Sequence, residues 1–322
     1  MITDVPGVRV GHSTDETGLT GCSVVLCDRP AVGGVELRGW ATGVHGLDIL
    51  DSRHLVPTLD GVVLSGGSGF GLEALFGVMQ HLEEQGHGFK AGPAVVPLVA
   101  GAILFDLGVG DPRARPTRAM GYRACLDATS DSPAEGNFGA GTGATVGKLA
   151  GISQAMKGGI GSASVRVGAA VVGALVAVNS LGDVKDPERG NLLAGARNAA
   201  DGRQLIDTAA RIRGGFRLPA FDAAQHTTIG VIATDATLSK PEAGKVAELG
   251  MLGFSQALSP PHTAVDGDTL FCLSVGDIEV ESTALGLAAA EAVARAIVRA
   301  IKAAVSLPGL PAWQDLFGPP QP

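Results

Sequence analysis

Two adjacent threonines, Thr227 and Thr228, stand at the start of an apolar, β-branched run that continues through residues 229–233. A threonine at the first position of a strand becomes a nucleophile if the peptide bond before it is cut, because the freed α-amine can act as the base for its own hydroxyl. The junction between His226 and Thr227 is therefore a candidate cleavage site. The same pair also fits the start of an ordinary buried strand, where threonine is common.

Two further polar side chains have the chemistry to assist such a nucleophile. Lys148 ends a glycine-rich segment, residues 139–148, which is not a phosphate loop because Thr142 and Leu149 break that motif. A lysine there is either an ordinary surface residue or a cation that orients a nucleophile or lowers its pKa. Asn179 ends the apolar run 171–178, where its amide can donate to a developing oxyanion or simply form a turn.

An acid pair, Asp266 and Asp268, precedes another apolar run. Residues two apart share a face of an extended chain, so both carboxylates can converge on one hydroxyl or ammonium group. A solvated turn is the competing interpretation, and the spacing is a poor match to a calcium loop. The four cysteines and seven histidines lack zinc-site spacing, so no metal and no cofactor is expected.

A glycine-rich loop, residues 66–71, lies between an apolar run and a helical pattern. Backbone N–H groups at such a helix start can bind an anion or a carbonyl oxygen, which makes Gly67, Ser68 and Gly69 candidate substrate-binding residues. Leu72 occupies a position where the dinucleotide fingerprint needs a small residue, so that motif is excluded. A tight turn between strand and helix is the alternative.

The composition of the chain narrows the classes of molecule that it is expected to bind. The chain has 322 residues and a formal net charge of −8, which argues against nucleic acid and anionic membranes. The start lacks the features of a secretory signal, and the apolar stretch 282–305 carries four charged residues, so no membrane span is expected. Buried thiols in a reducing cytoplasm are the default expectation for the cysteines.

The pattern of apolar runs predicts an α/β fold in packed layers. Residues 179–225 lack periodic hydrophobicity and are interpreted as a long surface excursion, and residues 307–322 as an irregular tail. No linker or repeat divides residues 1–322, which favours a single domain. The expected strands are residues 7–11, 22–26, 61–64, 94–98, 169–178, 228–233 and 270–275, and the expected helices are residues 71–85, 240–258 and 283–305.

Acyl transfer to or from an amide or ester can use these side chains together: a threonine, a lysine, an asparagine and an acid pair. In this order the chain resembles the P1-type aminopeptidases, the L-aminopeptidase/D-esterase family, which includes β-peptidyl aminopeptidases and nylon-oligomer hydrolases. The resemblance covers nearly the whole chain. The segments that carry it are residues 4–12, 65–73, 139–148, 177–179, 226–229 and 266–271.

The resemblance implies a self-cleaving hydrolase that splits into residues 1–226 and 227–322. Thr227 matches the nucleophile, Asn179 the oxyanion donor, and Lys148, Asp266 and Asp268 the polar residues around them. The implied fold is an α-β-β-α sandwich of the ornithine acetyltransferase-like type, and the cleaved heterodimers are expected to form a homo-oligomer.

Two positions depart from the family pattern. His226 stands where relatives often have Asn or Gly, and Phe105 stands where several have a tyrosine near the substrate. The leading hypothesis is an aminopeptidase on short peptides or amino-acid amides. The alternatives are an endo-amidase of nylon-type ω-amino-acid oligomers and an uncleaved, inactive binding scaffold that uses the 66–71 loop as an anion site.

Overall fold

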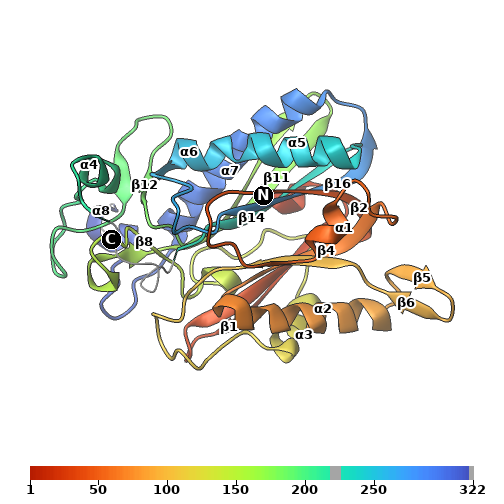
Figure 1. Ribbon diagram of the computed structural model, residues 1–322, viewed down its shortest axis with the longest axis horizontal. Coiled ribbons are helices and arrows are strands. Elements are labelled where there is room, and N and C mark those ends of the chain that lie inside the picture. The colour runs from red at the N-terminus through yellow and green to blue at the C-terminus, as the bar shows by residue number, and fades with distance from the viewer. Residues whose placement is uncertain (218–225, 319–322) are drawn as a thin grey trace.

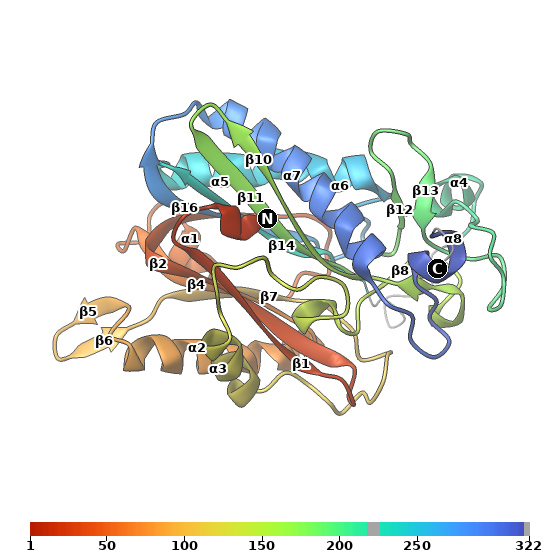
Figure 2. The same cartoon turned by 180° about the vertical axis from the view of Figure 1, so that it is seen from behind.

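The computed structural model describes residues 1–217 and 226–318, and its elements stack in four layers (Figure 1). One outer layer holds three helices and the other holds two. The three are α5 (Lys240–Gly250), α6 (Leu252–Ala257) and α7 (Ser282–Ala303), and the two are α2 (Glu73–Glu84) and α3 (Arg118–Leu126). The strands lie between them, as the reverse view also shows (Figure 2).

The two inner layers are strands of one mixed sheet. The path of paired strands is β10-β11-β14-β16-β2-β4-β7-β3, and β1 pairs with β2 beside it. The strands of the first layer are β10 (Gly159–Val167), β11 (Ala170–Val178), β14 (Ile229–Ala236) and β16 (Thr269–Ile278). Those of the second are β1 (Val8–Asp15), β2 (Thr20–Leu37), β3 (Val44–His45), β4 (Thr58–Ser65) and β7 (Val99–Ile103).

Strand β2 joins the two layers. Its first half pairs with β1 and β4, its second half pairs with β16, and the register against β4 shifts between Leu26 and Ala31. A break in register of this kind bends a strand, so the long strand can pass from one layer to the other. Side chains from both layers, such as Val25 and Leu64 opposite Leu175 and Val231, form one buried cluster between them.

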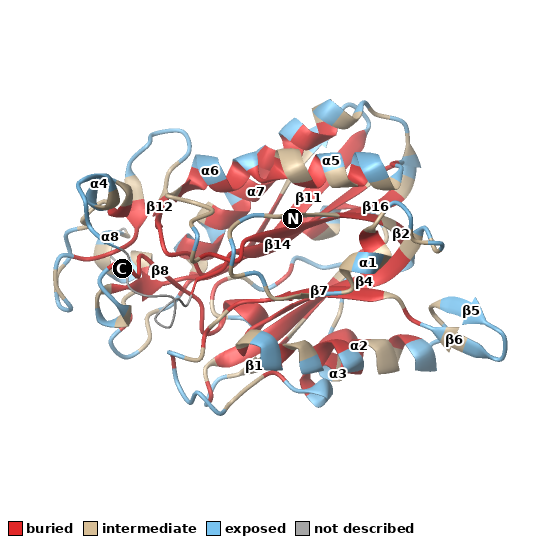
Figure 3. Cartoon of the chain, in the orientation of Figure 1, coloured by how far each residue is buried: buried red, intermediate tan, exposed pale blue. Residues whose placement is uncertain are grey.

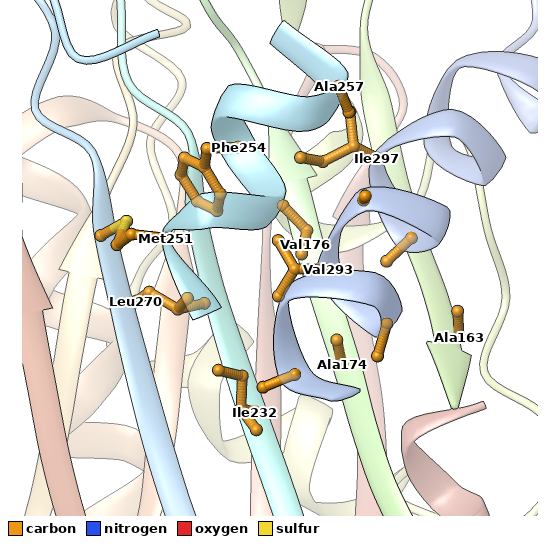
Figure 4. Close-up of a cluster of buried hydrophobic side chains, with 14 of the residues drawn as sticks. Ala163, Ala174, Val176, Ile232, Met251, Phe254, Ala257, Leu270, Val293 and Ile297 are labelled. Carbon is orange, nitrogen blue, oxygen red and sulfur yellow. The ribbon is translucent and has the colours of Figure 1, made fainter. Parts of the chain in front are cut away.

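The helices cover the outer faces of the strands by close packing of small residues. In Figure 4, Val293 and Ile297 of α7 lie against Ala174 and Val176 of β11. A Cβ atom on Gly161 of β10 would lie 2.3 Å from the carbonyl oxygen of Ala296, so only glycine allows the observed approach of helix and strand. This need explains part of the high glycine and alanine content.

Smaller elements make up the rest of the described residues, 1–217 and 226–318. The hairpin of β5 (Phe89–Ala91) and β6 (Ala94–Val96) projects from the body and is mostly exposed (Figure 3). No helix in the described parts of the chain has the length and apolar character needed to cross a bilayer. The other short elements are α1 (Leu47–Leu50), β8 (Thr145–Val146), β9 (Met156–Lys157), β12 (Asp183–Lys185), β13 (Leu192–Ala194), α4 (Thr208–Arg213), β15 (Leu258–Ser259) and α8 (Trp313–Phe317), together with four 3₁₀ turns.

The layered fold expected from the sequence is confirmed, and three local expectations need correction. The strand expected over residues 94–98 is shorter, because β6 ends at Val96 within the exposed hairpin and the next, buried strand β7 begins at Val99. The helix expected over residues 240–258 is two helices that divide at Met251. The excursion 179–225 is not all surface, because Asn179 and Asp183 are fully buried; residues 218–225 lie outside the described part.

Three strands bring the candidate residues to one edge. Strand β11 runs antiparallel to β14, so its C-terminal residue Val178 ends where β14 begins. Strand β16 runs parallel to β14, with Ile229 opposite Thr269. The end of β11 and the starts of β14 and β16 therefore meet at one edge. The residues beside them are Asn179, Thr227 and Asp268, respectively.

Candidate active site

Thr227 is held in the peptide chain against the carbonyl group that precedes it. Its hydroxyl donates a hydrogen bond to the carbonyl oxygen of His226, and its backbone N–H donates to the carbonyl oxygen of Asn179 at 2.9 Å. The side chain is buried, with 3% of its surface exposed. The candidate nucleophile and the bond that it would cleave are thus in contact.

Thr228 has a different environment. Its backbone N–H donates to Oδ1 of Asp268 at 2.8 Å, its carbonyl accepts from the N–H of Thr269 at 3.1 Å, and its hydroxyl makes no hydrogen bond to any described residue. These bonds continue the strand pairing of β14 with β16. Thr228 therefore leads directly into β14, which begins at Ile229, and Thr227 is the better-placed candidate nucleophile.

Gly267 supplies a second donor to the His226 carbonyl. Its backbone N–H points to the carbonyl oxygen of His226 at 3.3 Å. A Cβ atom at this position would lie 2.3 Å from the carbonyl oxygen of Ala41 and 3.0 Å from the hydroxyl oxygen of Thr227. An N–H group aimed at a carbonyl oxygen stabilises the negative charge that addition creates there. Sequence reasoning missed this residue, although it lies between the two acids that were singled out.

Asn179 is fully buried and its amide is oriented by three neighbours. Oδ1 accepts hydrogen bonds from Nζ of Lys148 at 2.8 Å and from the N–H of Thr145 at 3.0 Å. Nδ2 donates to the carbonyl oxygen of Phe105 at 3.0 Å. The backbone carbonyl of Phe105 thus helps to orient the amide that the sequence analysis assigned to the oxyanion.

Lys148 is a buried cation in contact with Asn179, and not the surface residue that was the alternative interpretation. Nζ donates to the carbonyl oxygens of Thr145 and Asn179, both at 3.0 Å, and to Oδ1 of Asn179. All three partners are pure acceptors, so they match the three protons of an ammonium group. Burial lowers the pKa of Lys148 to about 7, while the negative charges of Asp266 and Asp106 act in the opposite direction.

The two carboxylates of the acid pair bind the backbone around the threonines. Oδ1 of Asp266 accepts from the N–H of Leu181 at 3.3 Å, and Oδ2 accepts from the N–H of Thr263 at 3.1 Å and from its hydroxyl. Burial, followed by the charge of Asp268, raises the pKa of Asp266 to about 7.

Both carboxylate oxygens of Asp268 likewise have hydrogen-bond partners. Besides the N–H of Thr228, it accepts the N–H of His262 at 3.1 Å and lies 2.9 Å from Nδ1 of that ring. In this form of the chain every oxygen of the acid pair already has a protein partner. The pair therefore orders the backbone around Thr227 and does not offer an open site for an ammonium group.

The glycine loop borders this cluster through Asp106. Gly67 and Ser68 have φ values of +77° and +54°, and their N–H groups donate to Oδ1 of Asp106 at 2.7 Å and to the carbonyl of Leu104 at 3.0 Å. Thr20 donates to Oδ2 of Asp106 at 2.7 Å. Two of the three loop residues expected to bind an anion or a carbonyl oxygen, Gly67 and Ser68, thus have occupied N–H groups, and only that of Gly69 has no bond to a described residue. This weakens the anion-site interpretation, and Asp106 is a candidate site residue that sequence reasoning missed.

A second buried lysine holds the segment that carries Lys148. Nζ of Lys157 donates to the carbonyl oxygens of Gly141 at 2.8 Å, Ala144 at 3.0 Å and Gly158 at 3.3 Å. Burial lowers the pKa of Lys157 to about 7. Lys157 does not touch Asn179 in these bonds, so the two lysines differ in what they support.

His226 itself is buried, with 4% of its surface exposed. Burial, followed by the positive charge of Lys148, lowers the pKa of its imidazole to about 2, and Nδ1 makes no hydrogen bond to the described residues. The ring is therefore neutral at physiological pH. The residues immediately before it, 218–225, lie outside the described part of the chain.

Comparison with known proteins agrees with this geometry. A model of peptidase family S58 matches residues 1–312. An uncharacterized aminopeptidase of Mycobacterium leprae is 38% identical over 98% of this chain and 94% of its own length. A 6-aminohexanoate-oligomer endohydrolase of Kocuria sp. is 30% identical over 93% of this chain and 85% of its own length.

A solved structure shows the same fold. The L-aminopeptidase D-Ala-esterase/amidase of Ochrobactrum anthropi, described as a variant of the Ntn hydrolase fold, superposes with a TM-score of 0.68 at 22% identity, covering 94% of this chain and 86% of the other. The resemblance read from the sequence is thereby confirmed. The chain is a hydrolase that belongs to peptidase family S58.

Proposed function

We propose that this protein is a self-processing amide hydrolase whose nucleophile is the N-terminal Thr227 of a subunit comprising residues 227–322. The observation that supports it most is the contact between the Thr227 hydroxyl and the His226 carbonyl, with the N–H of Gly267 on the same oxygen. A hydroxyl group and an N–H donor that both contact one carbonyl group are what this reaction requires, which supports the proposal.

The first reaction is cleavage of the chain itself. Oγ1 of Thr227 attacks the carbonyl carbon of His226, and the oxyanion forms on an oxygen that already accepts from Gly267. The C–N bond then breaks as the Thr227 nitrogen takes a proton, which leaves an ester between His226 and the Thr227 hydroxyl. Water hydrolyses the ester, so that His226 gains a carboxylate and Thr227, whose α-amine was freed when the C–N bond broke, regains its hydroxyl.

The second reaction is turnover of the substrate. The α-amine of Thr227 takes the hydroxyl proton, Oγ1 attacks the substrate amide, and the amine returns the proton to the leaving group. Water then releases the acyl group. The roles proposed for the neighbours are an oxyanion donor for the Asn179 amide and a positioning cation for Lys148, since Lys148 binds both oxygens of Asn179.

We propose short peptides or amino-acid amides with a free N-terminus as substrates, because four relatives at 38% identity carry the name aminopeptidase. The second candidate is an endo-amidase on ω-amino-acid oligomers, the activity named for relatives at 30% identity. An aminoacyl p-nitroanilide and an N-blocked amide oligomer separate the two. Hydrolysis of the first alone supports the aminopeptidase, and hydrolysis of the blocked oligomer supports the endo-amidase.

We also propose that cleaved chains associate into a homo-oligomer in a reducing compartment such as the cytoplasm. Leu55 and Trp40 are 90% and 85% exposed, and burial of such side chains favours association. All four cysteines are buried free thiols, the state that a reducing compartment maintains. Sedimentation of the purified protein tests the association: a single sedimenting species with the mass of one chain would rule it out.

A further inference from the structure

Arg115 carries a guanidinium group that forms no ion pair with any residue that the structure describes. Its Cζ lies 3.6 Å from the centre of the Phe70 ring, at the glycine loop, and that ring is 57% exposed. Nε is buried and has no hydrogen-bond partner within the described residues, and no ion pair of Arg115 occurs there. Burial of an unpaired donor on a cation is costly, so the arrangement calls for a ligand that accepts hydrogen bonds.

The acidic residues closest to Arg115 along the chain and around the glycine loop have other partners. Asp111 pairs with Arg113, through a side-chain contact of 3.4 Å and a backbone bond of 2.9 Å. Asp106 accepts from Thr20 and Gly67, and Glu73 accepts from the N–H of Arg118 at 3.2 Å. The chain has 32 acidic and 24 basic residues, so acids are in excess, yet Arg115 forms no ion pair with any described one.

Arg115 lies next to the glycine loop, which borders the active site. A Cβ atom on Gly67 would lie 2.7 Å from Cδ of Pro116, so residues 115–116 pack directly on that loop. Gly67 in turn binds Asp106, and the carbonyl of the preceding Phe105 binds the Asn179 amide. A series of contacts through the glycine loop thus links Arg115 and Phe70 to the residues around Thr227.

The chemistry of a stacked arginine indicates what it binds. When one face of a guanidinium lies on an aromatic ring, the edge of the fork remains available for two parallel hydrogen bonds to a carboxylate. Each residue of an extended peptide spans about 3.5 Å, so the carboxylate of a short peptide is only a few residues from its scissile bond.

We propose that Arg115, stacked on Phe70, binds a carboxylate of the peptide substrate and so makes the enzyme selective for short acidic or free-carboxylate substrates. This inference rests on the proposed hydrolase function. The carboxylate is either the C-terminus of the peptide or the side chain of an acidic residue, and both present the same two oxygens.

The test compares the tripeptide Ala-Ala-Ala with its C-terminal amide. The wild-type enzyme should cleave the acid with a kcat/KM roughly 10- to 100-fold higher than the amide, the effect of hydrogen bonds to a charged group. Arg115→Gln should remove this preference by lowering kcat/KM for the acid far more than for the amide. Arg115→Lys should restore part of it, because a lysine keeps the charge without the fork.

A second arm identifies the source of the carboxylate. It compares the p-nitroanilides of glutamate and glutamine, which differ only in the side chain of the acyl residue. A preference for glutamate that Arg115→Gln abolishes supports the side chain as the ligand, and a preference between the tripeptides alone supports the C-terminus.

Two controls separate a loss of carboxylate binding from a loss of folding. Arg113→Gln is the matched variant, because Arg113 lies in the same loop but is 89% exposed and pairs with Asp111, and it should keep the preference. Equal melting temperatures and equal chain cleavage show that Arg115→Gln is folded and processed. If the wild type cleaves alanine p-nitroanilide but shows no preference in either arm, the inference is wrong although the proposed function holds. If no amide is hydrolysed, the proposed function itself fails.

Discussion

The backbone nitrogen of Thr227 lies 2.9 Å from the carbonyl oxygen of Asn179, to which it donates a hydrogen bond. In the cleavage that we propose, this amide nitrogen becomes the α-amine that acts as base. The acceptor of its hydrogen bond is already in place in the intact chain. An amine that donates one hydrogen to Asn179 keeps its lone pair available for the hydroxyl of the same residue.

Lys148→Met tests the role of the cation bound to Asn179. The variant leaves the Asn179 oxygens without their charged donor, so we expect kcat of the mature enzyme to fall roughly 100-fold. The matched control is Lys157→Met, since Lys157 is equally buried and also binds three acceptors but makes no bond to Asn179. Both variants lose stability, and only Lys148→Met should lose activity per folded molecule. Equal losses of activity would contradict the assigned role.

Gly267→Ala tests the donor to the scissile carbonyl. The new Cβ would lie 2.3 Å from the Ala41 carbonyl oxygen, so residue 267 must shift and its N–H moves away from His226. We expect chain cleavage to slow by at least 10-fold, as followed by denaturing electrophoresis after synthesis.

The control for this variant is Gly244→Ala in helix α5, where a Cβ meets no atom within 4 Å. It should cleave normally and gain up to about 1 kcal/mol of stability from the higher helix propensity of alanine. Normal cleavage of Gly267→Ala would show that the N–H of residue 267 is not needed.

Asp266→Asn tests the buried acid pair through pH. The pKa of Asp266 rises from 3.8 to about 7 on folding, so between these values the folded state binds more protons than the unfolded state. The unfolding free energy of the wild type, relative to Asp266→Asn, should therefore fall as pH rises from about 4 to 7, by at most about 1.4 kcal/mol per pH unit. Urea titrations at several pH values measure it. A difference that stays constant or grows over this range would show that Asp266 is charged throughout.

Much of the fold could be predicted because its signals are local. The helix over residues 73–84 and the strands 170–178 and 229–236 follow from periodicity and apolar runs. The division of residues 240–258 at Met251 could not, because a break between helices depends on packing against α7. The burial of Asn179 and Asp183 could not be predicted either, because hydrogen bonds to residues distant in the sequence, such as that of Thr208 to Asp183, compensate for their polarity.

The sequence predicts candidate residue types for the site but not their contacts. Thr227, Lys148 and Asn179 are candidates by position and chemistry, and the structure brings the three residues together. The contribution of Gly267 comes from a backbone N–H, which no side-chain pattern reveals. Asp106 and Arg115 lie in loops whose approach to residues 66–71 depends on tertiary packing.

Cleavage between His226 and Thr227 is the central claim. The most direct measurement is N-terminal sequencing of the fragments of the purified protein, for the wild type and for Thr227→Ala and Thr227→Ser. The account predicts a fragment of the wild type that begins Thr-Thr-Ile-Gly, the same cut in Thr227→Ser, and an intact, inactive Thr227→Ala chain. An intact wild-type chain that hydrolyses amides, or a Thr227→Ala variant that retains activity, would contradict it.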